Sequence, residues 1–212
     1  AIYPGYGFLA ENAEFAQLCH DNGLKFVGPS AEHIRTMGDK SKAREVVKNL
    51  GVPVVPGSDG AYTDHKEAAA QTESVGYPML IKARSGGGGR GMRIVDDPSQ
   101  FADCFSQAHR EAEAAFGVGA LYLERLFKAV GQVGVVVLGD GQGRAVVFDE
   151  RDCSVQRRHQ KLIEESPSPV VDAPLRDKLK AAAIRLTEGI NYEGAGTIEF
   201  ILDPETREFF FI

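Results

Sequence analysis

The sequence predicts an α/β protein, more specifically an α+β arrangement in which short strands and helices alternate along the chain. Two observations carry this prediction: several segments show apolar residues at helical spacing, and short apolar runs typical of strands lie between them. A third observation is the Pro- and Gly-rich stretch 52–60, which indicates a hinge or linker between two bodies.

Before the hinge, the pattern predicts helices around one short strand. Helical spacing over 11–22 is followed by a strand pattern over 24–27. Ser30 is positioned to cap a short helix, and Asp39 to cap a second helix that runs to residue 50. We interpret these residues as the end of one α/β unit that passes into another.

After the hinge, the pattern is compact. The expected elements are a helix over 64–74, strands over 78–83 and 92–95, a long helix over 98–116 and a strand over 121–126. We expect this segment, about 55–126, to form a small subdomain that moves as a lid.

The remainder of the chain predicts a second α/β body. The expected elements are strands over 132–138 and 145–148 around a tight turn, a loop over 150–161, a helix over 175–188, and strands over 197–202 and 208–212. No apolar run approaches the ~20 residues that span a bilayer. The net charge of −6 argues against general affinity for nucleic acid. We therefore expect neither a membrane nor a nucleic acid as a partner.

Four consecutive glycines, Gly86–Gly89, lie between two predicted strands and directly after Lys82 and Arg84. Glycine is costly in backbone entropy, so such a run suits a loop whose bare amides approach a ligand closely. Successive N–H groups form a nest for an anion such as phosphate, and Lys82 is placed to reach the same anion. A flexible hairpin tip is the alternative. A Walker A loop is excluded, because no Gly-Lys-Ser/Thr follows.

Three further features carry possible chemistry. Lys40 offers a second lysine at a helix start, with a plain solvated lysine as the alternative. Residues 150–161 concentrate basic side chains and suggest a pocket for a small anion; a loop neutralised by its own acidic residues is the alternative. Glu199 interrupts an apolar strand, on the same face as Thr197 and Ile201. A carboxylate there suits a divalent cation such as Mg²⁺, or an arginine partner as the alternative.

Five segments carry a more specific signal. They are PGYGFLAEN (4–12), GPSAEHIRTMGDK (28–40), GGGGRGM (86–92), ERDCSVQRRHQKLIEE (150–165) and GAGTIEF (194–200). Together they resemble biotin carboxylase, the ATP-grasp component of biotin-dependent carboxylases, over essentially the whole chain. The resemblance implies the end of a Rossmann-like N-terminal domain over 1–37 and an ATP-grasp domain over 38–212. Both ends are interpreted as cuts within a longer polypeptide, so the ATP-grasp domain is expected to be incomplete.

The resemblance implies a role for each matching residue. Those expected to bind ATP are Lys40, Lys82, Gly88, Gly89, Glu124, Arg125, Phe127, Gln132, Gln156, His159 and Ile201. Those expected to take part in catalysis are Lys161, which would hold bicarbonate, Lys82 and His159. Glu199 is the expected ligand of Mg²⁺ or Mn²⁺, and Tyr6 and Gly7 are expected beside biotin.

The implied reaction is the ATP- and bicarbonate-dependent carboxylation of biotin, by way of carboxyphosphate, in an acyl-CoA-type carboxylase. Biotin would be carried on a carrier domain, and a carboxyltransferase component would use the product. The resemblance also implies a homodimer or larger assembly, in the bacterial cytoplasm or the mitochondrial matrix. Because a second metal-binding Glu, an Asn, a catalytic Arg and a general-base Glu would follow Ile212, we expect negligible turnover from these 212 residues alone.

The chain departs from the family pattern at three neighbouring positions. Gln132 stands where the family has a His that contacts the nucleotide, and Gly134 and Val136 stand where it has Glu and Gln. These changes motivate one alternative, a catalytically decayed module that binds nucleotide. Another ATP-grasp ligase, with a different carboxylate substrate, is a second alternative.

Overall fold

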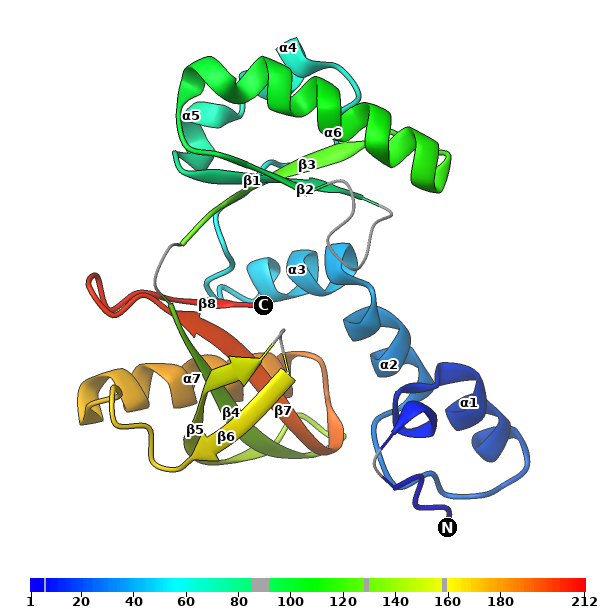
Figure 1. The fold of residues 1–212 in the computed structure, drawn as a ribbon. Coiled ribbons are helices and arrows are strands. Elements are labelled where there is room, and N and C mark those ends of the chain that lie inside the picture. The colour runs from blue at the N-terminus through cyan, green and yellow to red at the C-terminus, as the bar shows by residue number, and fades with distance from the viewer. Residues whose placement is uncertain (6, 85–91, 128–129, 158–159) are drawn as a thin grey trace. The chain divides into compact units, whose positions relative to one another are not determined.

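The computed structural model describes the whole chain except residues 6, 85–91, 128–129 and 158–159, and the backbone alone at 40–41. The chain divides into two compact units (Figure 1). One unit consists of Ala1–Val54 and Ala129–Ile212, and the other of Val55–Lys128. Among the described residues, no helix is both long and apolar enough to cross a membrane.

The N-terminal part of the first unit is helical. Its elements are a 3₁₀ turn η1 (Phe8–Glu11), α1 (Ala13–Asp21), α2 (Ala31–Gly38) and α3 (Lys40–Asn49). The predicted caps are confirmed: Ser30 Oγ accepts from His33 N at 3.1 Å, and Asp39 Oδ1 accepts from Lys42 N at 3.2 Å. The predicted strand 24–27 is wrong. In the described chain Phe26 makes a single bridge to Ile2, and one bridge does not build a strand ladder.

The rest of this unit is an antiparallel five-stranded sheet of order β6-β5-β4-β7-β8, with one long helix. The elements are β4 (Gly131–Asp140), β5 (Ala145–Arg157), β6 (Gln160–Glu165), α7 (Ala173–Gly189), β7 (Glu193–Leu202) and β8 (Phe209–Phe211). Helix α7 packs across one face of the sheet (Figure 1). The core consists of alternate strand residues and the apolar side of α7: Val133, Val135, Val137, Ile198, Phe200, Leu202, Leu175, Leu179 and Leu186. We call the opposite face, where the side chains of Lys161 and Glu199 are 27% and 30% exposed, the open face.

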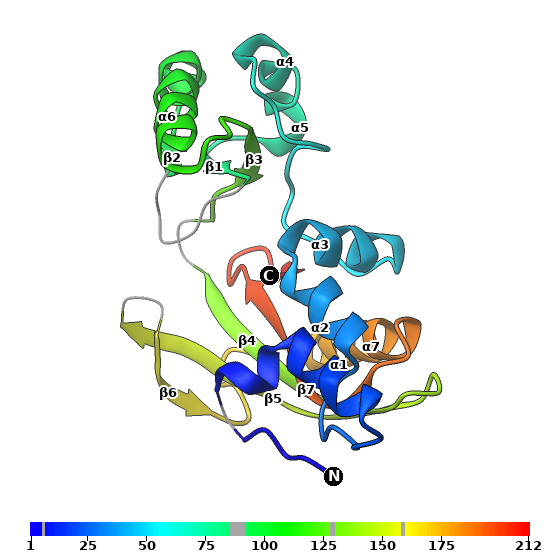
Figure 2. The ribbon, with the colours of Figure 1, turned by 90° about the vertical axis from the view of Figure 1, so that its right-hand side faces the viewer.

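The predicted loop 150–161 is wrong in the structure. Strand β5 continues to Arg157, and β6 pairs with it in antiparallel fashion from Gln160 onward (Figure 2). The segment lacks the apolar alternation that would predict a strand. Its polar side chains instead lie on the open face and at the edge of the sheet. Pairing with β4 on the far side supplies the hydrogen bonds that make Asp152 and its neighbours a strand.

The second unit contains a three-stranded antiparallel sheet of order β2-β1-β3, formed by β1 (Met79–Ala83), β2 (Met92–Val95) and β3 (Leu121–Arg125). Its helices are α4 (His65–Ala69), α5 (Thr72–Val75), a 3₁₀ turn η2 (Pro98–Gln100) and α6 (Phe101–Phe116). The predicted helix 64–74 is thus split. The hydroxyl of Thr72 donates to the carbonyl of Ala69 at 2.9 Å, and this side-chain bond competes with helical continuation.

The core of the second unit lies between its sheet and α6. Met79 and Ile81 of β1, with Leu121 and Leu123 of β3, are fully buried against Phe105 of α6. Burial of each such side chain stabilises the unit by about 1.5–3 kcal/mol before the entropic cost is counted. The core thereby fixes β1 and β3, which carry three of the predicted site residues, Lys82, Glu124 and Arg125.

Candidate functional site

The open face of the five-stranded sheet carries a polar cluster contributed by four strands. It contains Gln132 of β4, Gln156 of β5, Lys161 of β6 and Glu199 of β7, and we call these four residues the polar cluster. The predicted alternation of β7 is confirmed. Glu199 is half-buried and lies between Ile198 and Phe200, which point into the core.

Hydrogen bonds join the polar cluster into one chain. Lys161 Nζ donates to Glu199 Oε1, and Gln132 Nε2 donates to Glu199 Oε2 at 2.6 Å. Gln156 Nε2 donates to Gln132 Oε1 at 2.5 Å and to the carbonyl of Cys153 at 2.7 Å. Both carboxylate oxygens of Glu199 are therefore engaged, one by a cation and one by a neutral amide.

The environment keeps the lysine of the cluster charged. Burial of the Lys161 ammonium disfavours its charged form. The hydrogen bond and negative charge of Glu199 outweigh this effect and raise the pKa of Lys161. Burial is the main cause that raises the pKa of the nearby Cys153 thiol. The thiol is therefore neutral at physiological pH and is no candidate nucleophile. The cluster offers a permanent cation and a carboxylate, which can hold an anion and a metal ion.

Ion pairs outside the polar cluster involve two described residues of the segment 150–161. Arg151 pairs with Glu164 at 2.7 Å, and the carboxylate of Glu150 accepts from Arg176 of α7 at 2.8 and 2.7 Å. Neither Arg151 nor Glu150 belongs to the polar cluster. The alternative of a salt-bridged segment therefore describes Arg151, whereas Glu150 pairs with a residue outside the segment and Lys161 faces the cluster.

The second unit holds a separate ion pair. Lys82 of β1 donates to Glu124 of β3, and its ammonium lies 5.8 Å from the centre of the Tyr122 ring. The guanidinium of Arg125 lies 5.6 Å from the centre of the Phe127 ring. Glu124 and Arg125 lie at the end of β3, and Lys82 lies on the neighbouring strand β1.

Several predicted residues have no described side chain. Tyr6, Gly88, Gly89 and His159 lie outside the described residues, and so does the side chain of Lys40. Gly7 precedes η1 with a φ of 136°, a conformation that favours glycine. Ile201 lies on the same strand face as Glu199, two residues along β7.

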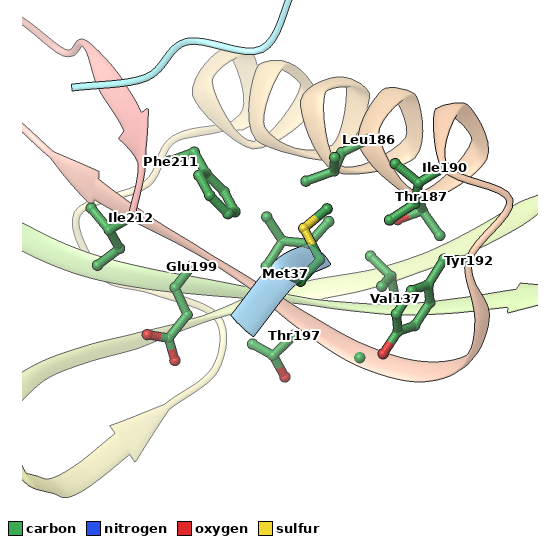
Figure 3. A pocket seen from close by; sticks show the side chains of 12 residues that line it. Met37, Val137, Leu186, Thr187, Ile190, Tyr192, Thr197, Glu199, Phe211 and Ile212 are labelled. Carbon is green, nitrogen blue, oxygen red and sulfur yellow. The ribbon is translucent and has the colours of Figure 1, made fainter. Parts of the chain in front are cut away.

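A pocket of about 320 Å³ lies near the edge of β7 (Figure 3). Its lining is mostly apolar, with Met37, Leu186, Ile190 and Phe211 around its interior. Figure 3 shows the carboxylate of Glu199 at the margin, directed away from Met37. Glu199 is the one member of the polar cluster in its lining. We therefore assign charged ligands to the open face of the sheet and not to this pocket.

The residues fit a metal ion held mainly by a bound nucleotide. Within the described ranges, no group of three His, Cys, Asp or Glu side chains comes together. Mg²⁺ prefers hard oxygen ligands and often binds through one or two carboxylates together with substrate phosphates. Glu199 can serve as one such ligand, because its carboxylate is about 30% exposed on the open face.

Sequence reasoning missed two contacts that shape the site. The Glu150–Arg176 pair joins residues 26 positions apart, and the Gln132–Glu199 hydrogen bond joins residues 67 apart. No local pattern signals either contact, because each depends on which strands and helices become neighbours. A prediction that residues 150–161 form strands would have been the useful signal for the Glu150–Arg176 contact.

The fold and the charged open face define an ATP-grasp domain. The chain matches the family model described as "Carbamoyl-phosphate synthase L chain, ATP binding domain" over residues 39–212, and the model "Biotin carboxylase, N-terminal domain" over residues 1–34. The chain therefore belongs to this ATP-grasp family, and within it to the biotin carboxylases. The predicted fold class and family are both confirmed.

Two curated relatives are identical to this chain at nearly half of the aligned positions. A biotin carboxylase of Nostoc sp. is 49% identical over 210 residues, which are 99% of this chain and 47% of the relative. The mitochondrial methylcrotonoyl-CoA carboxylase subunit alpha of Glycine max is 48% identical over 212 residues, 100% of this chain and 29% of that protein. The chain thus spans about half, or less, of the length of these relatives.

Solved structures agree with this assignment. A biotin carboxylase complex from Campylobacter jejuni is 46% identical with a TM-score of 0.83, covering 100% of this chain and 47% of that one. The biotin carboxylase domain dimer of 2-oxoglutarate carboxylase from Hydrogenobacter thermophilus, in complex with MgADP, ADP and bicarbonate, is 44% identical. Its TM-score is 0.81, with coverage of 100% and 46%.

Proposed function

We propose that the protein catalyses the ATP- and bicarbonate-dependent carboxylation of biotin, through carboxyphosphate, within a biotin-dependent carboxylase of the acyl-CoA type. One observation carries the proposal: Lys161 and Glu199 form an ion pair on the open sheet face of an ATP-grasp fold. A charged lysine suits bicarbonate, and a partly exposed carboxylate suits Mg²⁺. The related Hydrogenobacter domain was solved with those ligands and ADP, which supports the same ligands here.

The proposed roles follow the matching residues. Lys161 holds bicarbonate and Glu199 holds Mg²⁺, which neutralises the charge of the ATP phosphates when bound. Lys82 and Lys40 hold phosphate oxygens, while Gly88 and Gly89 close over them. The remaining nucleotide contacts are Glu124, Arg125, Phe127, Gln156, His159 and Ile201, and Gln132 stands at the position of a further nucleotide contact of the family. Tyr6 and Gly7 approach biotin.

The chain's own residues contribute mainly electrostatics. During phosphoryl transfer to bicarbonate, negative charge lies on the oxygens of the transferred phosphoryl group, and preorganised cations stabilise that charge. Lys161 is partly buried and stays charged beside Glu199, so the cation is already on this face of the sheet before an anion arrives. Lys82 is likewise held beside Glu124 on rigid strands.

Binding requires the internal ion pair to exchange partners. An anion that draws Lys161 away leaves Glu199 with the neutral Gln132 alone, whereas a metal ion that takes Glu199 leaves Lys161 without its carboxylate. Metal and bicarbonate together supply both missing partners. The two ligands should therefore bind with positive coupling.

This coupling is measurable by calorimetry. We expect bicarbonate to bind the ADP-loaded protein about five-fold or more tightly with Mg²⁺ than in EDTA. The variant Glu199→Gln should lose this difference, because its neutral amide neither binds the metal well nor pairs with Lys161 as an ion. Equal bicarbonate affinities with and without Mg²⁺ would contradict the exchange.

A catalytically decayed nucleotide-binding module is the second candidate. It is favoured by Gly134 beside Arg151, whose buried Nε has no hydrogen-bond partner among the described residues. The family has a Glu at this position, so a site constituent has been lost. Such a module would bind ATP, yet bicarbonate would change nothing.

Phosphate release from Mg-ATP tests the proposal directly. We expect release from the full-length protein to require bicarbonate and to be stimulated by free biotin. Release that is indifferent to bicarbonate would support the decayed module or another ATP-grasp ligase. ATP binding without any release would favour the decayed module.

The proposed partners are a biotin carboxyl carrier domain, a carboxyltransferase component and a second copy of the chain. The Hydrogenobacter domain is described as a dimer, which supports the last of these. Curated relatives include mitochondrial and chloroplastic forms besides the Nostoc protein. We propose the bacterial cytoplasm or the mitochondrial matrix for this protein.

A further inference from the structure

The side-chain amide of Gln132 has a single possible orientation. Gln156 Nε2 donates to both the carbonyl of Cys153 and Gln132 Oε1, so its two protons are used. The atom of Gln132 that faces Gln156 must therefore be the oxygen. Its Nε2 must face Glu199, where it donates at 2.6 Å. The hydrogen-bond network thus fixes the orientation of the Gln132 amide, and this amide in turn holds Oε2 of the Glu199 carboxylate in place.

The sheet register explains why Gln132 reaches Glu199. Gln132 lies opposite Ile201 on β7, which makes Glu199 its diagonal neighbour on the same face. Gly134 lies directly opposite Glu199 and contributes no side chain. The hydroxyl of Ser154 accepts from the backbone N–H of Gln132 at 3.0 Å, which further anchors this position. The diagonal amide thus takes the place of a cross-strand partner.

The two partners of Glu199 differ in what an arriving metal ion does to them. Lys161 is a cation that competes with a metal for Oε1, and it must leave. Gln132 is a neutral donor to the other oxygen, and it can remain when the metal binds. A retained hydrogen bond holds the carboxylate plane and presents Oε1 to the metal. Outer partners of this kind orient the ligands that touch the ion.

We propose that Gln132 is a positioning residue that holds Glu199 as a one-oxygen ligand for Mg²⁺. The inference rests on the proposed function, since it assumes that Glu199 binds the metal of a bound nucleotide. It gives Gln132 a role distinct from that of a nucleotide contact. In this chain, an amide at residue 132 and a glycine at residue 134 act together. The glycine has no side chain to contact Glu199 from the opposite strand position, so the diagonal amide of Gln132 makes the contact.

Direct metal binding tests the proposal without turnover. The probe is Mn²⁺, followed by electron paramagnetic resonance, with the protein saturated by a non-hydrolysable ATP analogue. We expect Gln132→Leu to weaken Mn²⁺ binding about ten-fold. Affinity for the analogue in EDTA should change less than about two-fold, because no metal is then held by Glu199. Gln142→Leu, in the exposed turn between β4 and β5, is the matched control and should match wild type.

A double variant separates positioning from other effects. In a Glu199→Ala background, Gln132→Leu should cause no further loss of Mn²⁺ affinity, since it acts through the missing carboxylate. Gln132→Met, measured in the same way, replaces the leucine variant if that variant does not fold. Wild-type Mn²⁺ affinity in the single variant would overturn the inference. An equal loss of analogue affinity in EDTA would also overturn it and make Gln132 a nucleotide ligand.

The same measurements distinguish the two levels of proposal. If wild type fails to bind the ATP analogue, the proposed function fails. If wild type binds both analogue and Mn²⁺ while Gln132→Leu behaves like wild type, the positioning role alone fails.

Discussion

Replacement of Lys161 by methionine is expected to lower bicarbonate-dependent ATP hydrolysis by the full-length protein by about 100-fold or more. Lys161 is a charged donor on the open face, and methionine keeps much of its length while removing charge and hydrogen bonding. Lys161→Arg should recover only part of the rate, because a planar guanidinium does not place its donors where the ammonium does. Phosphate release in steady state measures both effects.

The controls for this prediction lie within the same chain. Lys178→Met, at an exposed position of α7, removes an equal charge and should leave the rate unchanged. Lys161→Met should remain folded, since Glu199 keeps Gln132 and is partly solvated. A folded Lys161→Met protein with a rate within about three-fold of wild type would remove Lys161 from the proposed chemistry.

Replacement of Arg176 by methionine is expected to destabilise the protein by about 3–5 kcal/mol. Glu150 is 1% exposed, and Arg176 is its cationic partner through two hydrogen bonds. The variant leaves a buried carboxylate with backbone amides, those of Ser168 and of Glu150 itself, as its described donors. The large cost therefore comes from an unpaired buried charge, and urea unfolding measures it.

Two further variants test whether the loss of stability comes from the unpaired buried charge of Glu150. Lys180→Met, one turn later on α7, removes the exposed partner of Asp149 and should cost about 1 kcal/mol or less. The double variant Glu150→Met with Arg176→Met should recover most of the loss, because neither charge is then buried alone. Equal costs for Arg176→Met and Lys180→Met would show that the buried pair contributes no more than a surface one.

The pH dependence of the same pair has a definite sign. Burial favours the neutral carboxyl of Glu150, but the hydrogen bonds and charge of Arg176 outweigh burial and lower the pKa of Glu150. The stabilisation is therefore present above the ordinary pKa of a glutamate, about 4.3, and is lost as the pH falls through the lower folded value. The difference between wild type and Arg176→Met should shrink over that acidic range.

Local patterns predicted a large share of the fold. Ser30 and Asp39 cap helices as expected, because capping depends on a side chain and a backbone N–H two or three residues away. The face of Glu199 on β7 was predicted from strand alternation, which is equally local. Apolar helical spacing likewise located α1, α6 and α7 to within a few residues.

Non-local features were predicted poorly. Residues 150–157 are a strand because β4 pairs with 150–152 and β6 pairs with 155–157, although their polar composition resembles a loop. Residues 24–27 resemble a strand, yet they make one bridge in the described chain. Strand formation depends on a partner at a distant position, and a single sequence does not specify which segment supplies it.

The sequence by itself determined the family, the helix caps and the identity of the charged residues, because short motifs and periodicities encode them. Only the tertiary structure decided which charges meet. It placed Lys161 of β6 and Gln132 of β4 on the two oxygens of Glu199, and it buried Glu150 against Arg176 of α7. The physical reason is that ion pairs and hydrogen bonds require atoms within about 3 Å, and strand order and register set such distances between segments far apart in the chain.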